Sequence, residues 1–317
     1  MTEFDLIRRY FTRATPNALL GVGDDAALLK VGDDNVLAVS TDMLVSGTHF
    51  FPDADPFLLG HKTLAVNLSD MAAMGAAPRW ATLAIAMPEA DETWLKRFST
   101  GFFTLAQQYG VELIGGDTTR GPLNLCVTIF GELPAQQALC RSGAQPGDEI
   151  WVSGALGDAA LALAHLQSRI QLSAAEYAAC APALHQPQPR VALGLALRGI
   201  ANSAIDISDG LLADLGHILE ASQLAAWLDI AALPVSSVLQ NHSRHPIGQQ
   251  CALSGGDDYE LCFTSPATRH TEVLRIAAQL GLPLTCIGKV VAGNDYLVHD
   301  AAGNLLNLEA SGYDHFR

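Results

Sequence analysis

The chain has 317 residues, 49% of them hydrophobic, and a formal net charge of −15 at pH 7. This length favours two domains, and the hydrophobic content is ample for two cores. Binding to a nucleic-acid backbone or to an anionic membrane surface needs clustered lysine and arginine. Because the sequence has no such cluster, we expect neither kind of partner.

The first half of the chain alternates predicted strands with predicted helices. It opens with MTEFDLIRRYF, which predicts a charged amphipathic helix over residues 3–14 rather than a signal peptide. Strands are predicted at 36–45, 79–88, 111–117 and 123–133, and helices at 61–76 and 91–110. No apolar run reaches the roughly 18 residues of a membrane span. A cytoplasmic location is therefore the expectation.

Proline and glycine interrupt this pattern over residues 133–149. We place the domain boundary there, with residues 1–137 in the first domain and 138–317 in the second. The second domain predicts strands at 149–154, 203–208, 282–291 and 296–300, and helices at 158–168, 190–200 and 211–222. Both halves mix strands with helices, so the predicted fold class is α/β or α+β.

The six cysteines are Cys126, Cys140, Cys180, Cys251, Cys262 and Cys286. None forms a Cys-x-x-Cys pair, and most lie in apolar segments. We interpret them as reduced thiols of the core.

A carboxylate in the apolar helix at 61–76 is the first sign of a functional site. Asp70 lies in LAVNLSDMAAMGA, with no lysine or arginine within one helical turn and with Asn67 on the same face. A buried carboxylate must be neutral, paired or bound to a cation, because its desolvation is costly. The alternative is that Asn67 and Asp70 form an exposed stripe that faces water.

Further carboxylates stand at the ends of predicted strands or in glycine-rich turns. They are Asp42, Asp117, Asp206 and Asp209, together with Asp24 and Asp25 in GVGDD. Each has a structural explanation when taken singly; for example, Ser208 or Asp209 could cap the helix at 211–222. Taken together, they resemble a cation site. Oxygen ligands without a histidine or cysteine cluster favour Mg²⁺ over Zn²⁺.

Glycine-rich turns are a second sign of a functional site. GVGDD, GGDTTRG and SGGDDYE allow the backbone to approach a ligand closely, and N–H groups in such turns can bind anions. The sequence has no GxxxxGK[ST] and no HRD or DFG, which excludes a P-loop and a protein-kinase site. Glycine beside aspartate suits a nucleotide whose phosphates reach the protein through metal.

Few basic residues are placed to meet phosphate. Arg120 follows GGDTT and Arg141 lies beside the domain boundary, and each is either a nucleotide contact or a solvated loop arginine. His49 in SGTHF lies a few residues beyond Asp42, next to two phenylalanines. It is either structural or a ligand contact.

Eight segments stand in order along the chain: GVGDDAALL, STDMLVSGTHF, HKTLAVNLSDMAAMGAAPRWA, LIGGDTTRGPL, RSGAQPGDEIWVSG, AIDISDGLLADLGHI, SGGDDYELCFT and the terminal GYDHF. Together they resemble the thiamine-monophosphate kinase family over essentially the whole chain. The resemblance implies a two-domain fold of the aminoimidazole ribonucleotide synthetase-like superfamily, in which the N-terminal domain binds ATP and Mg²⁺ and pairs in a homodimer. It also implies conversion of thiamine monophosphate and ATP to thiamine diphosphate and ADP.

The resemblance further implies roles for individual residues. The magnesium ligands would be Asp25, Ser40, Thr41, Asp42, Asp70, Asp117, Asp206 and Asp209. The ATP contacts would be Gly116, Asp117, Arg141 and Ser208, and the substrate contacts would be His49, Asp257 and Tyr313. Family members often carry glutamate where this chain has Asp257, so the carboxylate reaches one methylene less far.

The implied chemistry is direct in-line phosphoryl transfer with several Mg²⁺ ions and with ATP as co-substrate. The acceptor is a phosphate oxygen that is already ionised at neutral pH, so no general base is expected and none is assigned. The alternatives are another ATP-using enzyme of the superfamily, or a non-catalytic nucleotide or metal sensor on the same fold. A reactive N-terminal cysteine or a C-terminal cysteine would favour two of those relatives, but none precedes Cys126 and the sequence ends in HFR.

Overall fold

The computed structural model describes residues 2–23, 25–293, 296–299 and 305–306. The chain forms two units, one of Met1–Met71 and Ala76–Gln136, and the other of Ala72–Gly75 and Gln137–Arg317. Both units combine sheet and helix, which confirms the predicted mixed class. No helix among the described residues is long and apolar enough to cross a bilayer.

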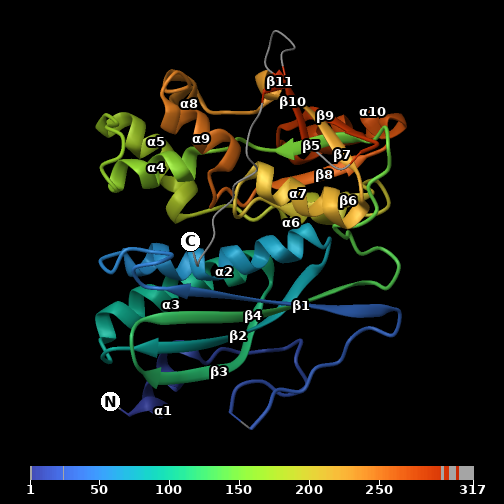
Figure 1. Cartoon of the computed structure of the whole chain (residues 1–317). Helices are drawn as coiled ribbons and strands as arrows, with labels where there is room; N and C mark the ends of the chain where they lie inside the picture. The colour runs from blue at the N-terminus through green and yellow to red at the C-terminus, as the bar shows by residue number, and fades with distance from the viewer. Residues whose placement is uncertain (1, 24, 294–295, 300–304, 307–317) are drawn as a thin grey trace. The chain divides into compact units, whose positions relative to one another are not determined.

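The described strands of the first unit form one sheet in the order β1-β4-β2-β3 (Figure 1). Their bounds are β1 Asn35–Val45, β2 Ala77–Met87, β3 Glu112–Arg120 and β4 Asn124–Pro134. β4 pairs antiparallel with β1 and β2, and β2 pairs parallel with β3. β1 and β3 are therefore the two edges of this sheet. The short helix α1, Glu3–Leu6, continues as a π-helix at Ile7–Phe11.

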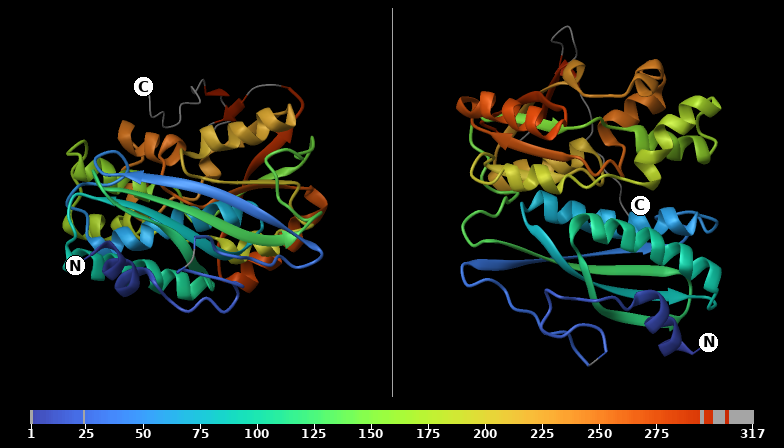
Figure 2. Two further views of the ribbon diagram at one scale, coloured as in Figure 1. Left: turned by 90° about the horizontal axis from the view of Figure 1, so that it is seen from below. Right: turned by 180° about the vertical axis from the view of Figure 1, so that it is seen from behind.

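Two helices, α2 (Pro56–Ala73) and α3 (Glu92–Tyr109), lie side by side over the sheet in Figures 1 and 2. They approach closely at Gly60 and Gly101, because a Cβ atom at either position would meet the backbone of the other helix. Asp91 caps α3 by accepting two backbone N–H bonds, and Gly110 ends it in the left-handed conformation. Alternate residues of β4 are buried, which places the core of this unit between sheet and helices.

The described strands of the second unit form a sheet in the order β11-β10-β7-β9-β5-β8-β6. Their bounds are β5 Glu149–Ser153, β6 Ser203–Asp206, β7 Ala225–Asp229, β8 Leu261–Ser265, β9 Leu284–Val291, β10 Tyr296–His299 and β11 Leu305–Leu306. Neighbouring strands are antiparallel except for the parallel pair β10–β7.

Helices pack on both faces of this second sheet. Their bounds are α4 Asp158–Leu166, α5 Ala174–His185, α6 Val191–Ala196, α7 Leu211–Ser222, α8 Ser237–Asn241, α9 Pro246–Ser254 and α10 His270–Leu280. Short 3₁₀ helices lie at Ile230–Ala232 and Ala267–Arg269. α7 packs on the face that carries Ile150 and Val152, whereas Trp151 on the other face contacts His270 of α10. A separate core joins α4, α5, α8 and α9.

Helix α5 is the clearest difference from the predicted elements. Its sequence, AAEYAACAPALH, is apolar or small almost all round, so it has no helical stripe, and it contains Pro182, a residue that usually breaks helices. The available signal was Ser173 followed by Glu176. These two residues form a capping box, with the Ser173 side chain accepting from Glu176 N–H and the Glu176 side chain accepting from Ser173 N–H.

The six cysteines are free thiols. Cys180, Cys251 and Cys262 are buried, and burial raises the pKa of each thiol. The prediction of a core position is wrong for Cys140, which is exposed in the segment between β4 and β5.

Candidate active site

Ser40, Asp42 and Asp70 come together where the edge strand β1 packs against α2. The hydroxyl of Ser40 donates a hydrogen bond to Asp70 Oδ2 at 2.5 Å. The backbone N–H of Asp42 donates to Asn67 Oδ1 at 3.2 Å, and Asn67 Nδ2 donates to the carbonyl of Thr63. Residues two apart on a strand share a face. Ser40 and Asp42 therefore both lie on the face toward α2.

This geometry decides between the two interpretations of the α2 carboxylate. Asn67 is 1% exposed and Asp70 is half-buried against β1, so the exposed-stripe alternative is wrong. The donors gathered here are carboxylate and hydroxyl oxygens, which fit Mg²⁺. Among the described residues, no three histidine, cysteine, aspartate or glutamate side chains gather closely enough to hold an ion alone. Phosphate and water oxygens would complete the ligand set, as is usual for Mg²⁺.

Thr41 and Asp117 lie on the face of the sheet that points away from α2, opposite to the face that carries Ser40 and Asp42. Thr41 Oγ1 is 2.9 Å from Thr128 Oγ1 on β4, and Asp117 precedes Thr118, which is buried on the face under the helices. Strands lie about 4.8 Å apart, so three spacings, about 14 Å along the sheet, separate Asp42 on β1 from Asp117 on β3. Within one chain these two carboxylates are too far apart to share one ion.

The remaining predicted residues of the first unit lie in turns or tight backbone. Gly116 has a φ of 147°, and a Cβ atom there would meet the backbone of Leu83, so packing of β3 on β2 requires glycine. His49 Nδ1 accepts the backbone N–H of Val45 at 3.0 Å. The neutral ring therefore carries its proton on Nε2. Asp25 lies in an exposed turn between the bridged residues Leu20 and Leu28.

In the second unit, Asp206 ends β6 and Asp209 follows in the loop before α7. One oxygen of Asp214 holds this loop, because Oδ2 accepts the backbone N–H groups of Ser208, Asp209 and Gly210 at 3.0, 3.0 and 3.1 Å. Burial raises the pKa of Asp214 to about 7, with bonds from the loop opposing the rise and the charges of Asp206 and Asp209 adding to it. Gly210 has a φ of 114°, which favours glycine.

Three backbone hydrogen bonds join this loop to the SGGDDYE segment. They run from Ile207 N–H to the Glu260 carbonyl (2.8 Å), from Tyr259 N–H to the Ile207 carbonyl (2.8 Å) and from Asp257 N–H to the Ser208 carbonyl (2.9 Å). Asp257 has a φ of 68°, and its Oδ1 accepts the hydroxyl of Tyr259 at 3.0 Å. The predicted metal ligands Asp206 and Asp209 and the predicted substrate contact Asp257 thus belong to one bonded assembly.

Two further carboxylates belong to SGGDDYE, one half-buried and one buried. Asp258 accepts the backbone N–H of Gly157 through both oxygens, at 2.9 and 3.0 Å, and burial raises its pKa well above the ordinary value. Glu260, 5% exposed, accepts hydrogen bonds from the guanidinium of Arg190 and the hydroxyl of Ser153. These contacts fix the segment on β5 and α4.

The basic residues and the C-terminal tyrosine complete the predicted set. Arg141 is exposed, and its carbonyl accepts the hydroxyl of Ser222 at 3.4 Å. Arg120 Nε donates to the carbonyl of Pro88, in line with the interpretation as a loop arginine. Tyr313 lies outside the described residues.

Sequence reasoning missed three carboxylates that hold the backbone around the loop: Asp214, Asp258 and Glu260. For Asp214 a weak signal existed, since it is an acidic residue in the first turn of a helix that follows Ser-Asp-Gly. The doublet of acids in SGGDDYE gave no indication of which side chain would turn inward.

Two domain families match this chain. The N-terminal domain of AIR synthase related proteins matches residues 23–133, and their C-terminal domain matches residues 145–300. The thiamine-monophosphate kinase of Escherichia coli K12 is 50% identical over 318 residues, which span 99% of this chain and 98% of that protein.

Solved structures show the same likeness. The crystal structure of thiamine-monophosphate kinase from Stenotrophomonas maltophilia K279a has a TM-score of 0.85 at 48% identity, covering 96% of each chain. A structure of AaThiL complexed with AMPPCP and TMP has a TM-score of 0.79 at 29% identity, covering 99% of this chain and 96% of that one.

Proposed function

The chain belongs to the AIR synthase related proteins and, among them, to the thiamine-monophosphate kinase family, and on that premise we propose that it transfers the γ-phosphoryl group of ATP to thiamine monophosphate. The products are thiamine diphosphate and ADP. The observation that carries this proposal is the 50% identity to a thiamine-monophosphate kinase across 99% of the chain. The related structure with AMPPCP and TMP supports the same pair of substrates.

The proposed reaction does not need a general base. The acceptor is an ionised phosphate oxygen, so the protein's task is to bring two anions together in line and to offset their repulsion. On this acidic chain, Asp42, Asp70 and Ser40 would hold Mg²⁺ at the β1–α2 contact. Bound Mg²⁺ would supply positive charge to the phosphates of both substrates.

The other predicted residues keep their proposed roles. Asp25, Thr41, Asp117, Asp206 and Asp209 are proposed as further metal ligands. Gly116, Asp117, Arg141 and Ser208 are proposed as ATP contacts, and His49, Asp257 and Tyr313 as substrate contacts. A homodimer and a cytoplasmic location are likewise proposed, on the family resemblance.

An isotope transfer assay tests the function. The purified chain is incubated with Mg²⁺, ATP labelled at the γ-phosphate and thiamine monophosphate, and the label is expected in thiamine diphosphate. Free thiamine is the control acceptor, and it should remain unlabelled because its neutral alcohol would need a base. Label in free thiamine at a comparable rate, or no label in thiamine diphosphate, would show the assignment to be wrong.

A further inference from the structure

Asp214 is a carboxylate that the proposed reaction does not use, although it lies at the centre of the second unit's loop assembly. Its side chain is 3% exposed, and one oxygen accepts three consecutive backbone N–H groups. Three N–H groups that converge on one point form a nest of the kind that binds anions. Here the acceptor is the chain's own Asp214 side chain, so the N–H groups of Ser208, Asp209 and Gly210 are already engaged.

The carbonyl side of the loop is fixed as well. Ser208 and Ile207 accept backbone bonds from Asp257 and Tyr259. A Cβ atom on Gly256 would meet the carbonyl oxygen of Ser208, so the two segments are in close backbone contact. The loop is therefore held by Asp214 through its amides and by SGGDDYE through its carbonyls.

We propose that Asp214 is a positioning residue that fixes the carboxylates of Asp206 and Asp209 and, through the shared backbone bonds, the carboxylate of Asp257. This proposal rests on the proposed function, which places two metal ligands and one substrate contact on these segments. Asparagine at position 214 offers the three loop N–H groups only a neutral amide oxygen, which is a weaker acceptor than a carboxylate, and alanine offers none, so in either variant the loop takes other conformations. The affinity for metal then falls together with the affinity for the acceptor substrate.

The experiment compares Asp214→Asn and Asp214→Ala with Asp148→Asn. Asp148 is a matched control because it is also 3% exposed, lies in the same unit and accepts a backbone N–H, that of Gln145 at 2.9 Å, but on a segment without a proposed metal ligand or contact to thiamine monophosphate. For each protein, the thermal midpoint, the Mg²⁺ concentration for half-maximal activity and the KM for thiamine monophosphate are measured. Binding of Mn²⁺ in the presence of AMPPCP is measured by calorimetry.

Replacing a residue that orients metal ligands typically weakens metal affinity about 10- to 100-fold, and this range is expected for Asp214→Asn in both Mg²⁺ half-saturation and Mn²⁺ Kd. The KM for thiamine monophosphate should rise as well. Asp148→Asn should lower the thermal midpoint but change the Mg²⁺ half-saturation, the Mn²⁺ Kd and the KM by less than about 2-fold. Asp214→Ala should be more severe, and if it does not fold, the Asn variant decides.

Wild-type metal affinity and KM in a folded Asp214→Asn, with only the thermal midpoint lowered, would overturn the proposal and leave Asp214 a structural residue. The outcome is separate from the function test. If the wild-type chain does not phosphorylate thiamine monophosphate, the proposed function fails, and the Mn²⁺ binding comparison still decides whether Asp214 positions metal ligands.

Discussion

Side chains of one type take different roles within a few residues of this chain. In SGGDDYE, Asp257 lies on a left-handed backbone and its carboxylate accepts the hydroxyl of Tyr259, whereas the carboxylate of Asp258 accepts the backbone N–H of Gly157 and Glu260 is paired with Arg190. Burial and hydrogen bonding, rather than residue type, separate a carboxylate that can meet a ligand from one that holds the backbone.

The same reasoning limits how Ser208 can contact a nucleotide. Its backbone N–H is donated to Asp214 and its carbonyl accepts the N–H of Asp257. The side-chain hydroxyl is therefore the group best placed for a new bond. Ser208→Ala should raise the KM for ATP about 10-fold, the effect of losing one hydrogen bond of about 1.4 kcal/mol.

Ser208→Thr keeps the hydroxyl and is the matched control in steady-state kinetics. An unchanged KM for ATP in the alanine variant would mean that the nucleotide does not use this side chain.

Substitution of the proposed metal ligands of the first unit should reduce activity more than the Ser208 substitution does. Asn at position 42 or 70 keeps the shape of the side chain but removes the charge that would hold Mg²⁺. Asp42→Asn and Asp70→Asn should each reduce transfer by more than the roughly 10- to 100-fold that follows when only the support of a metal ligand is altered. Activity is measured over a range of Mg²⁺ concentrations, with circular dichroism as the check on folding. Near-normal rates for both variants at limiting Mg²⁺ would contradict the assignment.

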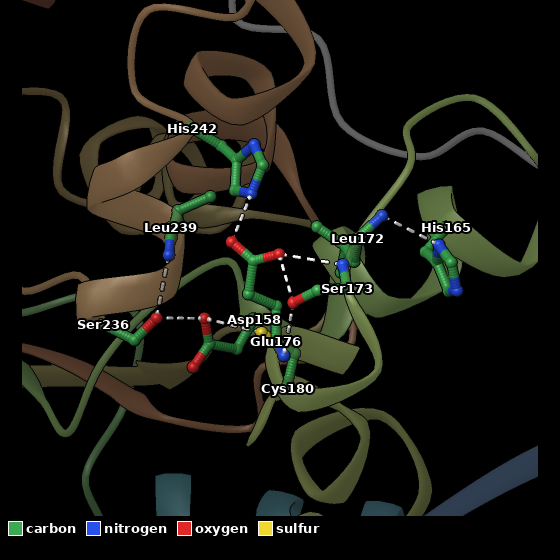
Figure 3. A network of polar contacts seen from close by, with 9 residues as sticks. All are labelled: Asp158, His165, Leu172, Ser173, Glu176, Cys180, Ser236, Leu239 and His242. Atoms are coloured by element: carbon green, nitrogen blue, oxygen red, sulfur yellow. Dashed lines mark hydrogen bonds and ion pairs between the residues drawn. The ribbon is translucent and has the colours of Figure 1, made fainter. Parts of the chain in front are cut away.

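Figure 3 shows a polar network where helices α4, α5 and α8 meet. Two carboxylates of this network have opposite pKa shifts. Asp158 accepts the hydroxyl of Ser236 at 2.6 Å, and burial, the main cause, raises its pKa above 3.8. Glu176 accepts the backbone N–H and the hydroxyl of Ser173 and pairs with His242, and these bonds, led by the backbone N–H, lower its pKa below 4.5.

The two shifts predict opposite effects of pH on stability. Because burial opposes ionisation of Asp158 in the folded state, the neutral carboxyl group adds to the free energy of unfolding. This contribution is present below pH 3.8 and is lost as the pH rises through the raised pKa. Glu176 stabilises above pH 4.5, and that contribution is lost as the pH falls through the lowered pKa. Relative to wild type, the thermal midpoint of Asp158→Asn should therefore rise as the pH is raised above 3.8, whereas that of Glu176→Gln should fall as the pH is raised toward 4.5 and should not change further above it.

Each variant serves as the control for the other, because both remove one negative charge from the same network. Thermal midpoints are measured by scanning calorimetry at several pH values. Parallel pH dependence of the two variants would contradict the assignment of opposite shifts.

At the scale of elements, periodicity predicted most of what the structure contains. The strand over 36–45 and the helix over 91–110 are β1 and α3 to within one residue at each end, because a run of β-branched and apolar residues, an amphipathic pattern and the glycine that ends a helix are local signals. α5 was missed because an alanine-rich helix packed on two sides has no stripe. The contact of Asp70 with Ser40 depends on how α2 lies on β1, which no local pattern encodes.

For the whole molecule, the exposed side of the first unit's sheet supports the proposed homodimer. β1 is an edge strand of eleven residues, and Leu37, Val39 and Met43 are 37%, 55% and 51% exposed on its face away from the helices. A long apolar edge strand is a site for pairing with another chain. Val39→Glu should convert the dimer to monomer in sedimentation velocity at micromolar concentration.

Leu274→Glu is the control, since Leu274 on α10 is 46% exposed in the other unit. A monomeric wild-type chain, or equal effects of the two substitutions, would contradict a dimer through β1.

The separation of Asp42 from Asp117 leads to the last prediction. The two carboxylates stand on opposite edges of one sheet, too far apart to bind one ion within a chain. Both can be ligands of one ion only if Asp42 of one copy lies close to Asp117 of a second copy, so that each site takes Asp42 from one chain and Asp117 from the other. Asp42→Asn and Asp117→Asn would then each be inactive alone, but a mixed dimer would carry one site with both substitutions and one with neither.

Equal mixing should restore about a quarter of wild-type activity, since half of the dimers are mixed and half of their sites are intact. The assay unfolds and refolds the two variants together and compares the mixture with each variant refolded alone. A double variant, Asp42→Asn with Asp117→Asn, mixed with wild type is the control. Every mixed dimer there has one substitution in each site, so only the quarter of dimers that are wild type should be active, whereas chains with independent sites would give about half of wild-type activity. Activity that stays at the level of the single variants would show that each chain uses its own carboxylates separately, and the shared site would be wrong.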